Sequence, residues 1–133
     1  NEHQHIGMGM IGELNKAMSE KVFLAYLKER MQVSVVRHSA LLGKDVKKVA
    51  VLGGSGAFAI ENAKRAKADA YITADLKYHE FFKAEGQILL ADIGHFESEQ
   101  YIKSLLFDYL SKIFPTFALS ISNVDTNPIK YYS

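Results

Sequence analysis

The sequence predicts an α/β fold in which a layered, mostly parallel sheet is flanked by helices. Short apolar or β-branched runs alternate along the chain with segments of helical periodicity, and one run ends in a cluster of glycines before the next helical segment. The chain has 133 residues, of which 48% are hydrophobic, and this is enough for one packed core. Strands that alternate with helices in this way usually form a parallel sheet with helices on its faces.

The first predicted elements lie between residues 19 and 52. Ser19 is suited to cap a helix, and the apolar residues that follow it recur at helical spacing, which predicts a helix over 20–31. The β-branched run at 33–38 and the short apolar run at 48–52 predict two strands. His38, near the end of the first strand, has no partner nearby in the sequence and is interpreted as structural.

The rest of the chain continues the alternation. The predicted elements are a glycine loop at 53–56, a helix over 57–67, a strand over 70–73, a helix over 76–85, a strand over 87–93, a helix over 96–113 and a strand over 117–121. The last helix has its apolar residues on one stripe, and Pro115 marks its end.

The composition excludes several classes of site. Lys and Arg number 16 and Asp and Glu 15, so a net charge of +1 gives no general attraction to nucleic acid or to an anionic membrane. The chain has no cysteine, which removes disulfides and thiolate chemistry and leaves His, Asp and Glu as the expected metal ligands. No apolar stretch is long enough to span a bilayer. A cytoplasmic protein without a membrane partner is therefore expected.

The predicted domain organisation is simple. Residues 1–18, rich in glycine and methionine, are expected to form an extended N-terminal segment, and residues 19–133 a single α/β domain. The chain opens without an initiator Met or a secretory signal, so we expect it to be part of a longer polypeptide. His3 and His5 lie in the extended segment and are interpreted as incidental.

Three loops follow predicted strands, at 53–56, 74–79 and 94–99, and a parallel sheet would place all three along one edge. The third loop carries His95 and Glu99, four residues apart at the start of a helix. The two side chains would share one face, where a single divalent cation could accept both. An ordinary helix start, with acidic residues favoured by the helix dipole, explains the same pattern without a ligand.

The other two loops have less specific signals. Asp75 and His79 are also four apart, and they could do general acid–base work or orient a metal ligand, although Asp75 could equally just cap its helix. Gly54 and Gly56 begin a G-x-G-x-x-A pattern between a strand and a helix, which is typical of dinucleotide binding. Dinucleotide binding therefore stays open as an alternative.

Four ordered motifs resemble the C-terminal half of the Nif-three-like proteins, also known as GTP cyclohydrolase type 2 homologues. The motifs are Gly7-Met-Gly-Met-Ile-Gly-Glu-Leu14, Val51-Leu-Gly-Gly-Ser-Gly-Ala57, Ala68-Asp-Ala-Tyr-Ile-Thr-Ala-Asp-Leu-Lys-Tyr-His79 and Asp92-Ile-Gly-His-Phe-Glu-Ser-Glu99. The resemblance covers roughly residues 7–130. The sequence departs from the family pattern at Met10, where Arg is frequent, and at Ala74, where Gly is usual.

The resemblance implies one lobe of a two-lobed fold that holds two divalent metal ions, such as Zn, Mn or Fe, between its lobes. His95 and Glu99 would be the metal ligands from this lobe. We further expect the catalytic candidates Asp75 and His79 to line the same cleft, where either could orient a ligand or shuttle a proton. The N-terminal lobe would supply a His-His pair and an Asp, which have no match in this chain. The chain alone is therefore expected to be inactive.

Three functions follow as hypotheses. The first is a metal-dependent hydrolase with a small-molecule substrate, completed by the N-terminal lobe and assembled as a homo-oligomer such as a hexamer. The second is a non-enzymatic, metal-stabilised scaffold or regulatory binding protein that presents a surface to a protein or a nucleic acid. The third is a dinucleotide-binding domain.

Overall fold

The structure is a computed structural model that describes residues 7–132, so the expectations for His3 and His5 lie outside the described residues. The chain divides into two compact units, one up to Ser98 and the other from Glu99 onwards. Across 7–132, no helix is both long and apolar enough to cross a membrane.

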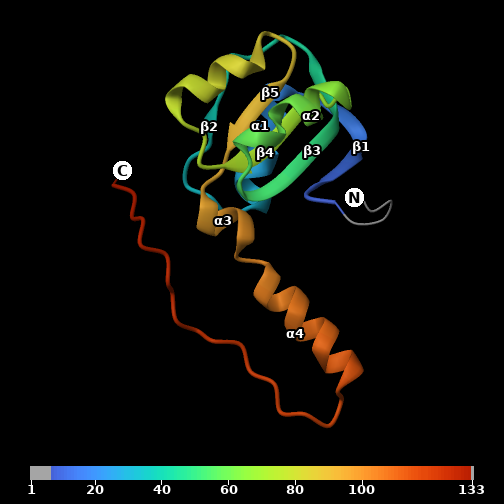
Figure 1. The fold of residues 1–133 in the computed structure, drawn as a ribbon, viewed down its shortest axis with the longest axis vertical. Coiled ribbons are helices and arrows are strands. Elements are labelled where there is room, and N and C mark those ends of the chain that lie inside the picture. Colours follow the sequence, from blue (N-terminus) through green and yellow to red (C-terminus); the bar gives the residue numbers. More distant parts are fainter. Residues whose placement is uncertain (1–6, 133) are drawn as a thin grey trace. The chain divides into compact units, whose positions relative to one another are not determined.

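From α1 to α4 the elements follow one another in the predicted order (Figure 1). The elements are β1 (Met10–Ser19), α1 (Glu20–Arg30), β2 (Arg37–His38), β3 (Asp45–Ser55), the 3-10 helix η1 (Ala57–Ala59), α2 (Ile60–Arg65), β4 (Ala70–Ala74), the 3-10 helix η2 (Tyr78–Ala84), β5 (Leu89–Asp92), α3 (His95–Glu99) and α4 (Ile102–Ile113). The predicted helix over 57–67 is divided into a 3-10 helix and an α-helix, and the predicted helix over 76–85 is a 3-10 helix.

The sheet is mixed rather than mostly parallel. Its strand order is β1-β3-β4-β5-β2, and β3, β4 and β5 run parallel in the centre. Both edge strands, β1 and β2, pair antiparallel to their neighbours. The prediction of a mostly parallel sheet is therefore not confirmed, because β1 and β2 run opposite to the three central strands.

Helices cover both faces of the sheet. On one face, α2 and η2 contribute Ile60, Ala63 and Ala84 to a core with strand residues such as Leu90. On the other face, Phe23 and Leu27 of α1 pack in a second core. Successive residues of β4 and β5 alternate between the two cores, as side chains in a strand must, and the sheet lies between these helices (Figure 1). Strands β4 and β5 are therefore buried on both faces.

The structure changes several predicted boundaries. The helix over 20–31 and the strand over 70–73 are confirmed within a residue or two at each end. Of the run at 33–38, only Arg37–His38 pairs as a strand. Val33 is apolar because it is buried in the core beneath α1, not because it belongs to a strand. The helix over 96–113 is divided in two, with residues 100–101 in a turn.

The extended segment predicted before residue 19 contains β1. Gly9, just before this strand, has φ +78°, and a Cβ there would lie 2.5 Å from the carbonyl oxygen of Val51, so the close approach to β3 requires glycine. The pairing with β3 is irregular between Glu13 and Met18. Beside this bulge, the Lys47 ammonium donates hydrogen bonds to the carbonyl oxygens of Leu14 and Asn15.

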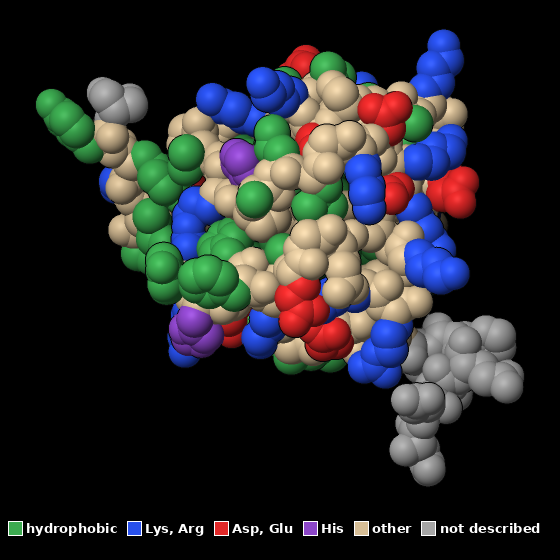
Figure 2. Space-filling view, turned by 90° about the horizontal axis from the view of Figure 1, so that it is seen from above, with side chains coloured by type: hydrophobic (Ala, Val, Ile, Leu, Met, Phe, Trp, Pro, Cys, Tyr) green, Lys and Arg blue, Asp and Glu red, His purple; other side chains and the backbone are tan. Residues whose placement is uncertain are grey.

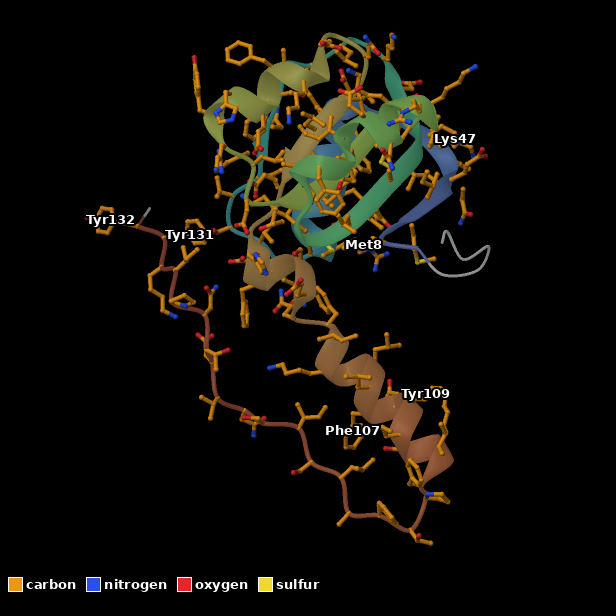
Figure 3. All side chains as sticks on the ribbon, viewed as in Figure 1. Met8, Lys47, Phe107, Tyr109, Tyr131 and Tyr132 are labelled. Carbon is orange, nitrogen blue, oxygen red and sulfur yellow. The ribbon has the colours of Figure 1, made fainter. Side chains whose placement is uncertain are left out.

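The second unit consists of α4 and an extended tail. Phe107 and Tyr109 leave α4 on opposite sides (Figure 3), and α4 has no buried residue. The predicted strand over 117–121 is extended but pairs with no other described strand. Within this unit, Leu110 and Ile121 help to line a cavity of about 290 Å³ between the helix and the tail.

Candidate functional site

Polar side chains gather at the carboxyl ends of the three parallel strands. Ser55 is the last residue of β3, Asp75 directly follows β4, and His95 begins α3, shortly after β5. The Ser55 hydroxyl donates a hydrogen bond to Asp75 Oδ2, and the same oxygen lies 2.6 Å from His95 Nδ1. The parallel register therefore places three residues from three loops in one hydrogen-bonded cluster.

The chemistry of the cluster is set by the carboxylate. An ionised carboxylate can only accept hydrogen bonds, so the contact requires His95 Nδ1 to carry the proton. The hydrogen bonds from Ser55 and then His95, together with the charge that His95 can carry, lower the pKa of Asp75 below its ordinary value. Asp75 is thus held as an anion that orients the imidazole of His95.

A second carboxylate fixes the loops that carry this cluster. Asp92, the last residue of β5, is only 4% exposed. It accepts hydrogen bonds from the backbone N–H of Leu76 at 2.9 Å and from the backbone N–H of Gly94 at 3.0 Å. Because Leu76 follows Asp75 and Gly94 precedes His95, Asp92 ties the two loops together.

Arg37 strengthens the same junction from the edge strand β2. Its Nη1 lies 3.1 Å from Asp92 Oδ2, its Nη2 donates to the carbonyl oxygen of Leu76 at 2.8 Å, and its guanidinium lies over the Phe81 ring, 5.2 Å from the centroid. Sequence reasoning did not identify Asp92, Arg37 or Ser55 as parts of the site. An Asp at the end of an otherwise apolar strand was the available signal for Asp92.

The backbone around Asp75 explains one departure from the family pattern. Asp75 itself has φ +57°, in the left-handed region, which Asp tolerates better than most residues. Ala74, where glycine is usual, is a buried residue of β4, so its side chain needs no unusual conformation. Met10, where Arg is frequent, is 75% exposed and contributes no charge.

The glycine loop packs closely against the side chains of β4. A Cβ on Gly56 would lie 2.0 Å from Thr73 Oγ1 and 2.5 Å from the Tyr71 hydroxyl oxygen. The Tyr71 hydroxyl donates to the carbonyl oxygen of Gly56 at 2.9 Å, and the Thr73 hydroxyl donates to that of Gly54 at 3.0 Å. The Gly54 N–H in turn donates to Ser98 Oγ at 2.8 Å. The close contacts explain glycine at position 56, and a φ of +67° explains it at position 54, without a bound pyrophosphate.

The remaining predicted site residues lie differently. His79 is exposed on η2, and its side chain has no hydrogen bond or ion pair with another described residue. Glu99 is the last residue of α3. Among residues 7–132, no three His, Asp or Glu side chains form a group that could hold a metal ion. The metal role of His95 and Glu99 and the catalytic role of Asp75 and His79 stay predictions.

The fold and these contacts define an α/β protein whose polar groups collect where parallel strands of a mixed sheet end, the position at which such sheets bind ligands. Comparison with known proteins then gives the family. The profile of Duf34/NIF3 (NGG1p interacting factor 3) matches residues 2–128, and the chain belongs to this family.

The relatives share both sequence and fold. The GTP cyclohydrolase 1 type 2 homolog of Staphylococcus epidermidis is 33% identical over 135 residues, and that of Bacillus subtilis is 36% identical over 130 residues. These matches cover 98% and 94% of this chain but only 37% and 35% of the relatives. The crystal structure of a Bacillus cereus protein related to NIF3 has a TM-score of 0.79 at 30% identity and covers 95% of this chain and 36% of its own. A Staphylococcus aureus structure has a TM-score of 0.82 at 26% identity, over 95% of this chain and 42% of its own. The chain therefore spans little more than a third of the length of these two curated relatives.

Proposed function

We propose that this chain is the metal-binding C-terminal lobe of a Nif-three-like protein and that it supplies His95 and Glu99 to a centre of two divalent ions. In the complete protein, this centre would serve a metal-dependent hydrolase with a small-molecule substrate. The observation that supports the proposal most directly is the 2.6 Å contact between His95 Nδ1 and Asp75 Oδ2.

This contact matters because of how histidine binds metals. A metal-ligating imidazole usually donates its second N–H to a carboxylate or a carbonyl oxygen, which fixes both the tautomer and the ring orientation. In this chain the Asp75 carboxylate accepts a hydrogen bond from His95 Nδ1–H, so Nε2 is the nitrogen that would bind a metal. Asp75 would act through His95, and the buried Asp92 would keep the two loops at the required separation.

The donor types fit a divalent transition metal. An imidazole and a carboxylate suit Zn, Mn or Fe and do not choose between them. When bound, such ions would polarise the substrate and lower the pKa of a water molecule. His79 is exposed on η2, and its imidazole would act as a general acid or base in the same cleft.

A scaffold function is the second candidate, and the exposed apolar side of α4 favours it. Leu105 and Tyr109 are 64% and 61% exposed, whereas the apolar face of a helix in a globular protein is usually packed against a core. Contact with the N-terminal lobe or with other subunits of a homo-oligomer such as a hexamer would bury these apolar side chains. Basic and acidic side chains are interspersed on the face in Figure 2, which favours a protein or small-molecule partner over nucleic acid. We expect either function to operate in the cytoplasm.

Metal analysis of the complete protein tests the first candidate. The protein is purified without chelator, and its metal content is measured beside that of His95→Ala and of His38→Ala. His38 is exposed on the edge strand β2, so it controls for the loss of an imidazole. We expect about two divalent ions per chain, lost or halved only in His95→Ala. Equal metal content in all three proteins would refute the assignment.

Chelator treatment separates the two candidates. After metal removal, the melting temperature and the oligomer size are measured on the same sample. A collapse of the assembly would favour a structural metal in a scaffold. An intact assembly that has lost its metal would favour a catalytic centre.

A further inference from the structure

The Asp75 carboxylate is shared between two donors that reach it from neighbouring strands. Ser55 Oγ–H, at the end of β3, and His95 Nδ1, after β5, both point at Asp75 Oδ2. These are the two side-chain hydrogen bonds of Asp75 among the described residues. The Asp75 side chain is nearly half exposed, so packing against neighbours does not fix its rotamer.

We infer that Ser55 is a positioning residue: through Asp75, its hydroxyl holds the imidazole of His95 in the tautomer that carries its proton on Nδ1. The inference rests on the proposed function only where it assigns Nε2 to a metal. The tautomer itself is a property of the metal-free chain.

The backbone on the C-terminal side of Asp75 is held by the hydrogen bond from the Leu76 N–H to Asp92. What remains free is rotation of the Asp75 carboxylate, and a hydroxyl bound to Oδ2 opposes that rotation. Without Ser55 the carboxylate can turn toward water, and the imidazole loses the acceptor that favours one tautomer over the other.

The geometry makes the effect specific to this serine. Ser98 also lies close to His95, but its Oγ accepts from the Gly54 N–H and donates to the carbonyl oxygen of His95, so it holds the backbone rather than the ring. Ser55 is therefore the hydroxyl that acts on the imidazole through Asp75.

The test is nitrogen NMR on the metal-free 133-residue chain labelled with ¹⁵N-histidine, at a pH where the imidazoles are neutral. Two-bond proton–nitrogen correlations distinguish the protonated ring nitrogen from the bare one, and loss of a signal in His95→Gln assigns the resonance. The variants are Ser55→Ala, Ser55→Thr and, as the matched control, Ser34→Ala, which removes an exposed serine hydroxyl elsewhere in the same unit.

We expect the unmodified chain, Ser55→Thr and Ser34→Ala to hold mostly the Nδ1–H tautomer, and Ser55→Ala to lower the ratio of the two tautomers several-fold. Urea unfolding confirms that each variant is folded, and Ser55→Cys, a near-isosteric weak donor, replaces Ser55→Ala if the alanine variant does not fold. An unchanged ratio in the Ser55 variant, or an Nε2–H tautomer in the unmodified chain, would overturn the inference.

Zinc affinity of the complete protein then connects this effect to the proposed function. Loss of a residue that orients a metal ligand typically weakens binding by about 10- to 100-fold, so we expect Ser55→Ala to weaken zinc binding by about 10-fold. A shifted tautomer with unchanged zinc affinity would support the role of Ser55 and refute His95 as a ligand. An unshifted tautomer would refute the role of Ser55 whatever the affinity.

Discussion

Replacement of Asp92 by Asn should destabilise the chain even though the two side chains have nearly the same shape. Asp92 is buried and accepts hydrogen bonds from two backbone N–H groups, one on each of its oxygens. An asparagine retains one oxygen and turns the other into an NH₂ group. Whichever way the amide faces, the N–H of either Leu76 or Gly94 loses its acceptor.

The expected loss of stability follows from the number of N–H groups that lose their acceptor. A buried N–H left without an acceptor costs about 1–3 kcal/mol. The ion pair with Arg37 adds little, because the Arg37 side chain is 54% exposed and water screens it. We therefore expect Asp92→Asn to lower the free energy of unfolding by about 2 kcal/mol. Asp92→Ala, which removes both acceptors, should lower it by about 4 kcal/mol.

Urea unfolding of the 133-residue chain, followed by circular dichroism, measures both values. Asp45→Asn is the matched control, because Asp45 is exposed at the start of β3 and should change stability by less than about 0.5 kcal/mol. If Asp92→Asn unfolds within about 0.5 kcal/mol of the unmodified chain, Asp92 does not hold the two loops together and the account of the site fails.

Three further changes test other parts of the structure. Gly56→Ala should lower the free energy of unfolding by about 2–3 kcal/mol in the same assay, because its Cβ would force the Tyr71 and Thr73 hydroxyls away; an unchanged midpoint would contradict the close packing. Burial raises the pKa of Tyr71 above its ordinary value of 10.0. The stability that the neutral Tyr71 hydroxyl contributes is therefore fully present below pH 10 and is lost as the pH rises through the raised pKa. Tyr71→Phe should cost about 1 kcal/mol at neutral pH and make stability fall less steeply in alkaline unfolding curves; an equally steep fall would assign the alkaline loss to other groups. Glu20→Gln should cost about 1–2 kcal/mol in urea unfolding, because the buried carboxylate accepts the N–H groups of Leu42 and Gly43; no loss would mean that the loop satisfies them otherwise.

The central strands were predictable because their surroundings are uniform. Strands β4 and β5 are buried on both faces, so their sequences read as short apolar runs. The antiparallel edges were not predictable in this way. Nearly all of β1 is exposed, and its pairing is decided by β3 rather than by a pattern of its own. The turn at 100–101 also has no local signal, since neither glycine nor proline occurs there.

The sequence predicts which loops carry the site but not which of their side chains are in contact. Spacing along the chain grouped Asp75 with His79 and His95 with Glu99, because four residues make one helical turn. The structure instead joins Asp75 to His95, which belong to different strand ends. Such a contact depends on the register of β4 against β5, and strands buried on both faces carry no alternating pattern that would fix this register.

The bulge in β1 also affects how the chain meets other copies of itself. An exposed strand of ten residues at the edge of a sheet is a ready template for intermolecular strand pairing and aggregation. The irregular stretch between Glu13 and Met18 breaks that template, and the Lys47 ammonium places a charge beside the carbonyl groups in its middle. The longest edge of the sheet is thereby divided into short pieces that are poor nuclei for aggregates.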